Sequence, residues 1–172
     1  MPILIKGGES VTDRWSLVRE TADPQALPEG PVIVNLATWL EHRAALMALG
    51  DAAVWLAPAD DPAALADDVF ALPLIAVDFP KFSDGRGYST ARLLRERFGF
   101  RGELRAVGDV LRDQLYYLYQ VGFDAFALRA DQDLETALSA FRDFSDGYQL
   151  TNRRTPAFRR PEARSGAAAR SS

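Results

Sequence analysis

The sequence contains no cysteine and a single histidine, His42. Without cysteine the chain cannot form a disulfide, use a thiolate nucleophile, or hold zinc or an iron–sulfur cluster through sulfur. One histidine leaves little material for a histidine-rich metal site or a Ser-His-Asp triad, and its place at the start of a predicted helix indicates a surface role. We therefore expect no metal site and no cofactor of the chain's own.

Membrane, targeting and nucleotide-binding signals are also missing. No apolar run approaches the ~20 residues of a membrane span, and the first residues lack the basic region and apolar core of a signal peptide. Gly85-Arg86-Gly87 lacks the third glycine of a dinucleotide fingerprint, and no Walker loop occurs. We expect a cytoplasmic protein.

Charge is distributed unevenly along the chain. The net charge is −4, and residues 151–172 contain six arginines and one glutamate, so this tail carries +5 and the body −9. An acidic body argues against nucleic acid as a partner. We expect one domain over residues 1–150 and a flexible arginine-rich tail over residues 151–172, and the pattern leaves the oligomeric state open.

Apolar runs typical of buried strands alternate with helical patterns. The predicted strands span 32–36, 53–57, 74–78, 103–107 and 124–128, and the predicted helices span 39–49, 62–70, 89–98, 110–121 and 133–144. Together with β-like stretches at 3–6 and 15–19, this order predicts an α/β fold, a mainly parallel sheet of about five βα units with an amino-terminal β extension. A complete eight-unit barrel takes about 250 residues, so we expect an open three-layer sheet, with a partial barrel as the alternative.

The junction after the strand at 74–78 gathers polar residues and glycines. Glycine permits close backbone approach, and the start of the following helix offers unpaired N–H groups, which together favour an anion. The predicted anion or substrate site consists of Lys81, Ser83, Asp84, Gly85, Arg86, Gly87 and Ser89, with Arg112 from the next helix. The alternative is a capped turn in which Ser83, Asp84 or Ser89 caps the helix and Arg86 is solvated.

The carboxyl ends of neighbouring parallel strands meet at one edge of a sheet, where ligands bind. We therefore expect Asp78 and Asp109 to lie near that loop, with Gly108, Arg129 and Asp131 beside them. Asp78 and Asp109 are the candidate catalytic acid and base, although a helix N-cap is the simpler role for Asp109.

The helix predicted over 110–121 carries a polar and aromatic strip beside its apolar face. Arg112, Tyr116 and Tyr119 lie on this strip, and tyrosine and arginine are favoured anchors of protein interfaces. We predict a partner surface here; the alternative is that the tyrosines fill the boundary of the core.

Four stretches resemble the bacterial domain-of-unknown-function family 934: residues 79–89, 92–95, 102–114 and 122–126. Members of that family are usually labelled oxidoreductases of sulfite reduction and are typically encoded beside the haem-containing reductase. The resemblance covers about residues 30–150. It implies a role in assimilatory sulfite or nitrite reduction and cysteine biosynthesis, with the sulfite or nitrite reductase haemoprotein as partner, and it supplies no catalytic residues.

The family label and the residues disagree, because a redox enzyme needs a cofactor or a redox-active side chain and the sequence shows neither. We expect an accessory protein of sulfite reduction that binds the reductase or a small oxyanion at the strand ends. The alternative is a small-molecule enzyme, an oxidoreductase of sulfur metabolism, that uses Asp78, Lys81, Arg86 and Asp109.

Overall fold

The structure is a computed structural model that describes residues 3–151. The predicted tail from residue 152 onward lies outside the described residues. One sheet organises the described part, and its strands follow the order β2-β1-β8-β7-β6-β5-β4-β3. The eight strands are β1 (Ile3–Lys6), β2 (Glu9–Thr12), β3 (Ser16–Leu17), β4 (Val32–Asn35), β5 (Ala52–Leu56), β6 (Leu74–Phe79), β7 (Glu103–Gly108) and β8 (Ala125–Phe126).

The first two strands form a hairpin. Gly7 and Gly8 occupy its turn with φ values of 66° and 82°, and a two-residue hairpin turn of this kind needs positive φ at both positions. β1 also pairs antiparallel with β8, with Ile5 opposite Phe126. From β3 to β8, by contrast, neighbouring strands run parallel.

Helical segments connect the parallel strands, and one more follows the last strand, β8. They are η1 (Pro24–Ala26), α1 (Leu36–Glu41), α2 (Arg43–Leu49), η2 (Pro62–Phe70), α3 (Arg86–Arg92), η3 (Leu93–Arg97), η4 (Arg112–Gln114), α4 (Leu115–Gln120) and α5 (Leu134–Thr151). Asn35 caps α1 by accepting a hydrogen bond from the Thr38 N–H at 2.8 Å. Gly50 ends α2 with φ 80°, a left-handed conformation that favours glycine. Within residues 3–151, no helix is long and apolar enough to cross a bilayer.

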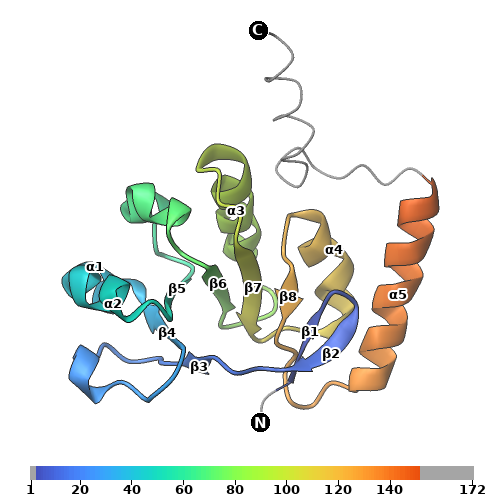
Figure 1. Cartoon of the computed structure of the whole chain (residues 1–172). Coiled ribbons are helices and arrows are strands. Elements are labelled where there is room, and N and C mark those ends of the chain that lie inside the picture. The colour runs from blue at the N-terminus through green and yellow to red at the C-terminus, as the bar shows by residue number, and fades with distance from the viewer. Residues whose placement is uncertain (1–2, 152–172) are drawn as a thin grey trace, which may run out of the picture.

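The sheet curls into half of a barrel, with the helices outside it (Figure 1). The large apolar cluster joins one face of the sheet to side chains from each of the larger helical segments: Trp39, Leu46, Leu65, Leu94, Leu118 and Phe141. Helices therefore cover the convex face, and the described part of the chain has two layers.

Alternate residues of each strand face opposite sides of the sheet. In β6, Ile75 and Val77 belong to the large cluster, whereas Leu74 and Ala76 belong to a smaller cluster on the concave face. Trp15 and Leu17 pack against this smaller cluster. The segment around β3 therefore covers the concave face, where helices are absent within residues 3–151.

The α/β class is confirmed, but the predicted sheet of about five βα units, mainly parallel, is wrong. The sheet is mixed, because the amino-terminal hairpin adds two antiparallel pairings beside β8. The regular βα pattern also fails after β5, where η2 consists of 3₁₀ turns broken at Ala66 with φ 48°. The expected three layers are replaced by the curled two-layer arrangement, which matches the partial-barrel alternative.

A buried arginine ties the helical layer to the loops that enter β7 and β8. The side chain of Arg95 is only 3% exposed and donates to the carbonyl oxygens of Phe100, Gly102 and Gly122 at 3.0, 2.9 and 2.9 Å. It also pairs with the Asp124 carboxylate. These hydrogen bonds hold in place the two loops that precede β7 and β8.

Candidate functional site

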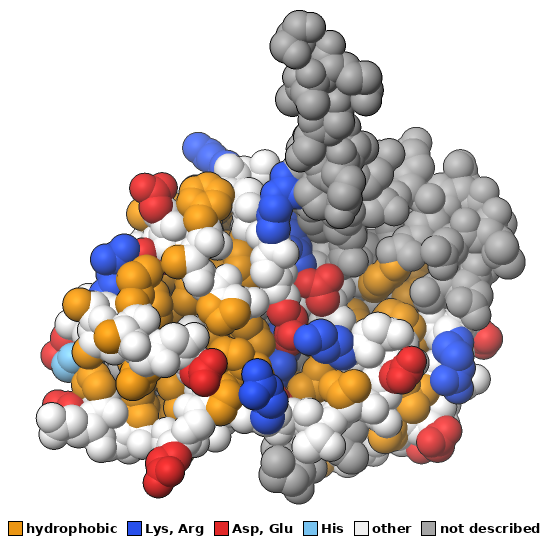
Figure 2. All heavy atoms as spheres, viewed as in Figure 1, with side chains coloured by type: hydrophobic (Ala, Val, Ile, Leu, Met, Phe, Trp, Pro, Cys, Tyr) orange, Lys and Arg blue, Asp and Glu red, His pale blue; other side chains and the backbone are white. Residues whose placement is uncertain are grey.

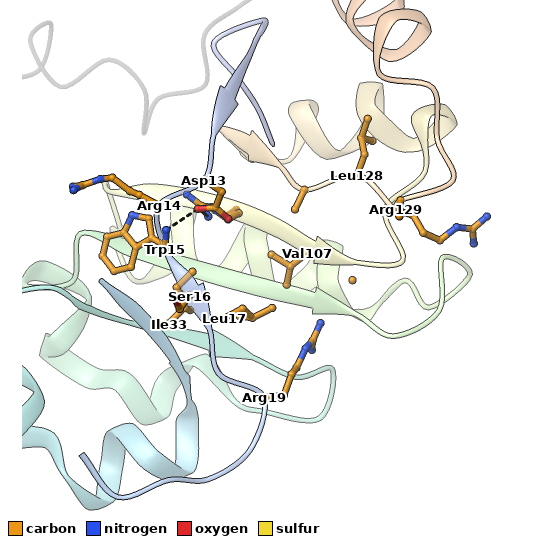
Figure 3. A pocket seen from close by; sticks show the side chains of 14 residues that line it. Asp13, Arg14, Trp15, Ser16, Leu17, Arg19, Ile33, Val107, Leu128 and Arg129 are labelled. Atoms are coloured by element: carbon orange, nitrogen blue, oxygen red, sulfur yellow. Dashed lines mark hydrogen bonds and ion pairs between the residues drawn. The ribbon is translucent and has the colours of Figure 1, made fainter. Parts of the chain in front are cut away.

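The concave face contains a cavity of about 580 Å³ (Figure 3). Its apolar walls come from the β3 segment and the central strands, and its charged lining is mostly arginine. The main lining residues are Trp15, Leu17, Ile33, Val107, Leu128, Asp13, Arg14, Arg19, Arg105 and Arg129. Figure 2 shows acidic and basic side chains gathered near the middle of the face turned to the viewer, beside hydrophobic ones.

Asp78 lies on the concave face at the carboxyl end of β6, as the alternation in this strand requires. Its side chain is only 8% exposed, and its Oδ1 is 2.9 Å from Nη1 of Arg19. This Oδ1 nevertheless accepts no hydrogen bond, because the Arg19 N–H groups do not point at it. Buried carboxylates are normally hydrogen-bonded, so a buried oxygen with only a non-directional contact is a candidate for function.

Arg19 is the more exposed partner in this pair. Its side chain is 45% exposed, and its guanidinium lies over the Trp55 ring at 5.0 Å from the centroid. In Figure 3 it points from the segment after β3 toward Val107. Among the described residues the guanidinium makes an ion contact and a cation–π contact but no directed hydrogen bond, so its fork of N–H donors is available to a ligand.

Gly108 makes room for the Asp78 carboxylate. It ends β7 with φ 96°, and a Cβ at this position would lie 2.6 Å from Asp78 Oδ1 and 2.6 Å from the Phe79 carbonyl oxygen. Gly108 also lines the cavity. The glycine at this strand end is therefore required by the packing of Asp78.

Asp109 links the loops after β6, β7 and β8. Its Oδ2 accepts the Phe82 N–H at 2.9 Å, and its Oδ1 pairs with Nη1 of Arg129 at 2.7 Å. The Arg129 guanidinium and the Phe82 N–H lower the pKa of Asp109. Arg129 also binds Asp131 through Nε at 2.7 Å, and in Figure 3 its side chain points away from Val107. Asp109 thus stays ionised and cross-links loops.

A second group of charged residues is centred on Arg105, which also lines the cavity. Arg105, on β7, is buried and donates to Asp13 and Glu103, each at 2.8 Å. Lys6 of β1 pairs with the same Glu103 at 2.8 Å. Asp13 in turn accepts the Trp15 N–H at 3.0 Å, which fixes the β3 segment over the concave face.

The predicted loop of residues 81–89 lies beside this site but outside the cavity lining. Asp84 accepts hydrogen bonds from Nε of Arg86 at 3.1 Å and Nη2 at 2.8 Å, and these contacts lower the pKa of Asp84 to about 2. Gly85 has φ −83°, so its conformation does not require glycine. The exposed residues of the loop are Lys81, Phe82, Ser83, Gly85, Arg86 and Ser89.

Packing also accounts for Gly87. A Cβ there would lie 2.5 Å from the ring of Phe79, so the absent side chain admits an aromatic residue of the core. The predicted oxyanion site on this loop remains a prediction. Its arginine is already engaged by Asp84, whereas Arg19 in the cavity is not engaged in this directed way.

The residues of the predicted partner strip differ in their surroundings. Tyr119 packs against Phe141 and Phe144 of α5, with ring centroids 5.5 and 5.9 Å apart. Tyr116 lies edge-on to Phe144 at 5.4 Å and to Tyr117 at 5.2 Å. Tyr117 is the most exposed of the three, at 62%. Arg112 is partly exposed and its main-chain N–H donates to Gln132.

Sequence reasoning placed Asp78, Gly108, Asp109 and Arg129 at one sheet edge, and the structure brings them together there. It missed Arg19, Asp13 and Arg105. Arg105 left a usable signal, because a charged residue inside an otherwise apolar strand needs a buried partner. The sequence carries no such signal for Arg19. Its position depends on how the segment around β3, which contains no recognisable motif, crosses the sheet.

Within the described range, no three histidine, aspartate or glutamate side chains come together in a way that could hold a metal ion. His42 joins α1 to α2, and its Nε2 lies 3.7 Å from Glu41. It does not line the concave cavity.

A comparison with known families matches residues 53–158 to a model described as a bacterial protein of unknown function (DUF934). No curated protein and no solved structure matches the chain. The matched range includes β6, β7 and β8, whose carboxyl ends carry Asp78, Gly108 and Arg129.

Proposed function

Since this chain belongs to the bacterial DUF934 family of unknown function, we propose that it is an accessory protein of assimilatory sulfite reduction that binds a small oxyanion-bearing molecule in the concave cavity. The link to sulfite reduction and cysteine biosynthesis rests on the usual label of the family and on its usual place beside the reductase haemoprotein. The cavity is the part of the proposal that the geometry supports.

One observation carries the binding role: the guanidinium of Arg19 lines the cavity without a directed hydrogen bond. A guanidinium presents several N–H donors in a fork that matches the oxygens of carboxylate, sulfate or phosphate groups. The apolar walls next to it, which include Leu17, Ile33 and Val107, lower the local dielectric constant on that side and so strengthen such a contact.

Titration calorimetry with sulfite and sulfate tests this role. We expect millimolar binding to the wild-type protein and a loss of about tenfold to a hundredfold in Arg19→Gln, the range of a charge-assisted contact. Arg97→Gln removes the same charge from an exposed position on the helical layer and should leave binding unchanged. Arg86→Gln separates the cavity from the loop: if it abolishes binding and Arg19→Gln does not, the predicted loop is the site.

The partner role needs its own experiment. Affinity capture from cells grown on sulfate as sole sulfur source, followed by mass spectrometry, should recover the reductase haemoprotein. Tyr117→Ala removes the exposed tyrosine and should reduce capture, whereas Tyr119→Ala, which also opens a gap between α4 and α5, should reduce stability first. Failure to recover the reductase with either partner as bait would contradict the accessory role.

A second candidate function, a small-molecule enzyme, is favoured by the buried Asp78. Its Oδ1 accepts no hydrogen bond, and the carboxyl end of a parallel strand is where substrates bind in α/β folds. Of the other residues of this alternative, Lys81 and Arg86 lie on the exposed loop, and Asp109 is bound by Arg129 and the Phe82 N–H. Incubation with a mixture of sulfur metabolites tests it: one component should disappear with wild-type protein and persist with Asp78→Asn. An absorption spectrum of the purified protein would reveal a bound flavin or haem.

A further inference from the structure

We propose that Arg19 and Asp78 together recognise a zwitterion of the α-amino-acid type, with Arg19 binding its carboxylate and Asp78 its ammonium group. The inference rests on the proposed binding role of the cavity and names the chemical class of the ligand. Nη1 of Arg19 and Oδ1 of Asp78 lie 2.9 Å apart, and each would bind one charged group of the ligand.

Opposite charges side by side select a ligand with opposite charges a few bonds apart. A ligand that carries only a negative charge would be attracted by Arg19 but repelled by Asp78. A ligand that carries only a positive charge would be attracted by Asp78 but repelled by Arg19. In an α-amino acid the ammonium and carboxylate are attached to one carbon, so both fit a guanidinium and a carboxylate that are in contact. Such a ligand replaces one ion contact with two charge-assisted hydrogen bonds.

The Oδ1 atom of Asp78 is the proposed acceptor for the ammonium group of the ligand. It is buried and accepts no directed hydrogen bond, although Nη1 of Arg19 lies 2.9 Å away, so this oxygen has acceptor capacity left for a donor. Asp78 lies directly behind Arg19 and Gly108, both of which line the cavity. Arg19 is 45% exposed and makes no directed hydrogen bond with Asp78, so its guanidinium can turn toward the ligand carboxylate while the ligand ammonium replaces it as the counter-charge of Asp78.

The apolar part of the cavity then takes the side chain of the ligand. In Figure 3 the side chains of Leu17, Ile33 and Val107 are drawn between those of Asp13 and Arg19, and all five residues line the cavity. An unbranched apolar side chain of a few carbons suits this stretch, because each buried methylene contributes favourably. The ligand class is therefore an amino acid with an extended, mainly apolar side chain.

Three matched probes test the proposal on the full-length protein by titration calorimetry: L-norleucine, hexanoate, which lacks the ammonium, and pentylamine, which lacks the carboxylate. We expect saturable binding of L-norleucine and about tenfold to a hundredfold weaker binding of each truncated probe. Asp78→Asn should weaken the binding of L-norleucine and, because it removes the negative charge that repels a lone carboxylate, strengthen the binding of hexanoate. Arg19→Gln should weaken the binding of L-norleucine and hexanoate and, because it removes the positive charge beside Asp78, strengthen the binding of pentylamine.

Equal affinity for L-norleucine and hexanoate in the wild type would overturn the proposal, and this comparison does not depend on any variant folding. Absence of L-norleucine binding would overturn it as well. If L-norleucine does not bind but sulfate does, and sulfate binding is lost in Arg19→Gln, the proposed oxyanion site stands and only the zwitterion proposal is refuted. If sulfate also fails to bind, both fail.

Discussion

Replacement of Gly108 by alanine should disrupt the site and the fold together. The position has φ 96°, and the added Cβ would lie 2.6 Å from both Asp78 Oδ1 and the Phe79 carbonyl oxygen. Left-handed backbone costs a non-glycine residue about 1–2 kcal/mol, and forcing extra volume into a packed site costs about 1–3 kcal/mol. We therefore expect Gly108→Ala to lower the free energy of unfolding by about 2–5 kcal/mol.

Gly50→Ala is the matched control for this prediction. Gly50 has φ 80°, and a Cβ added there meets nothing within 4 Å, so the substitution carries the backbone strain without the collision. Its cost should be about 1–2 kcal/mol. Urea unfolding measures both variants, and a shift of the midpoint with an unchanged m value isolates stability. Equal losses in the two variants would refute the claim that Asp78 is packed against Gly108.

The remaining predictions concern stability. Arg95→Met leaves the carbonyl oxygens that Arg95 binds without a donor and should cost more than about 3 kcal/mol, at about 1–3 kcal/mol for each unsatisfied buried group. The exposed Arg97→Met should change stability by less than about 0.5 kcal/mol, and a similar loss in both variants would contradict the role of Arg95. Asp68 is buried and accepts hydrogen bonds from Arg43 and Trp39, and Arg43 lowers the pKa of this carboxyl below its ordinary 3.8. Because its folded-state pKa is depressed, its stabilising contribution is present above about pH 4 and is lost as the pH falls through the lower folded-state value. Chemical unfolding between pH 5 and pH 2.5 should therefore show a steeper loss for wild type than for Asp68→Asn, and parallel curves would argue against the pair.

The sequence predicted the parallel strands well, because strands buried on both faces form continuous apolar runs. β5 shows why the layers could not be predicted: Ala53 and Trp55 are as apolar as Val54 and Leu56, so the run does not reveal what covers each face. Helices cover one face, and the β3 segment covers the other. The break in η2 at Ala66 also has no sequence signal, since neither glycine nor an internal proline marks it.

The candidate site was predictable where it follows from strand ends. Asp78 and Asp109 come directly from the rule that ligands bind at the carboxyl ends of parallel strands. Arg19 could not be inferred in this way. Its contact with Asp78 depends on a crossing of the concave face that is set by pairings such as Asp13 with Arg105, which are distant in the sequence.

The antiparallel pairing of β1 with β8 has a consequence for the order of folding. Ile5 and Lys6 pair with residues 125 and 126, and Asp13 meets Arg105 across 92 positions. Long-range contacts form late, because the chain loses the entropy of a long loop before it gains them. During synthesis the first residues emerge long before β7 and β8. The central strands can therefore pair while the amino-terminal segment still waits for its partners, and the cavity is completed only when nearly the whole domain has left the ribosome.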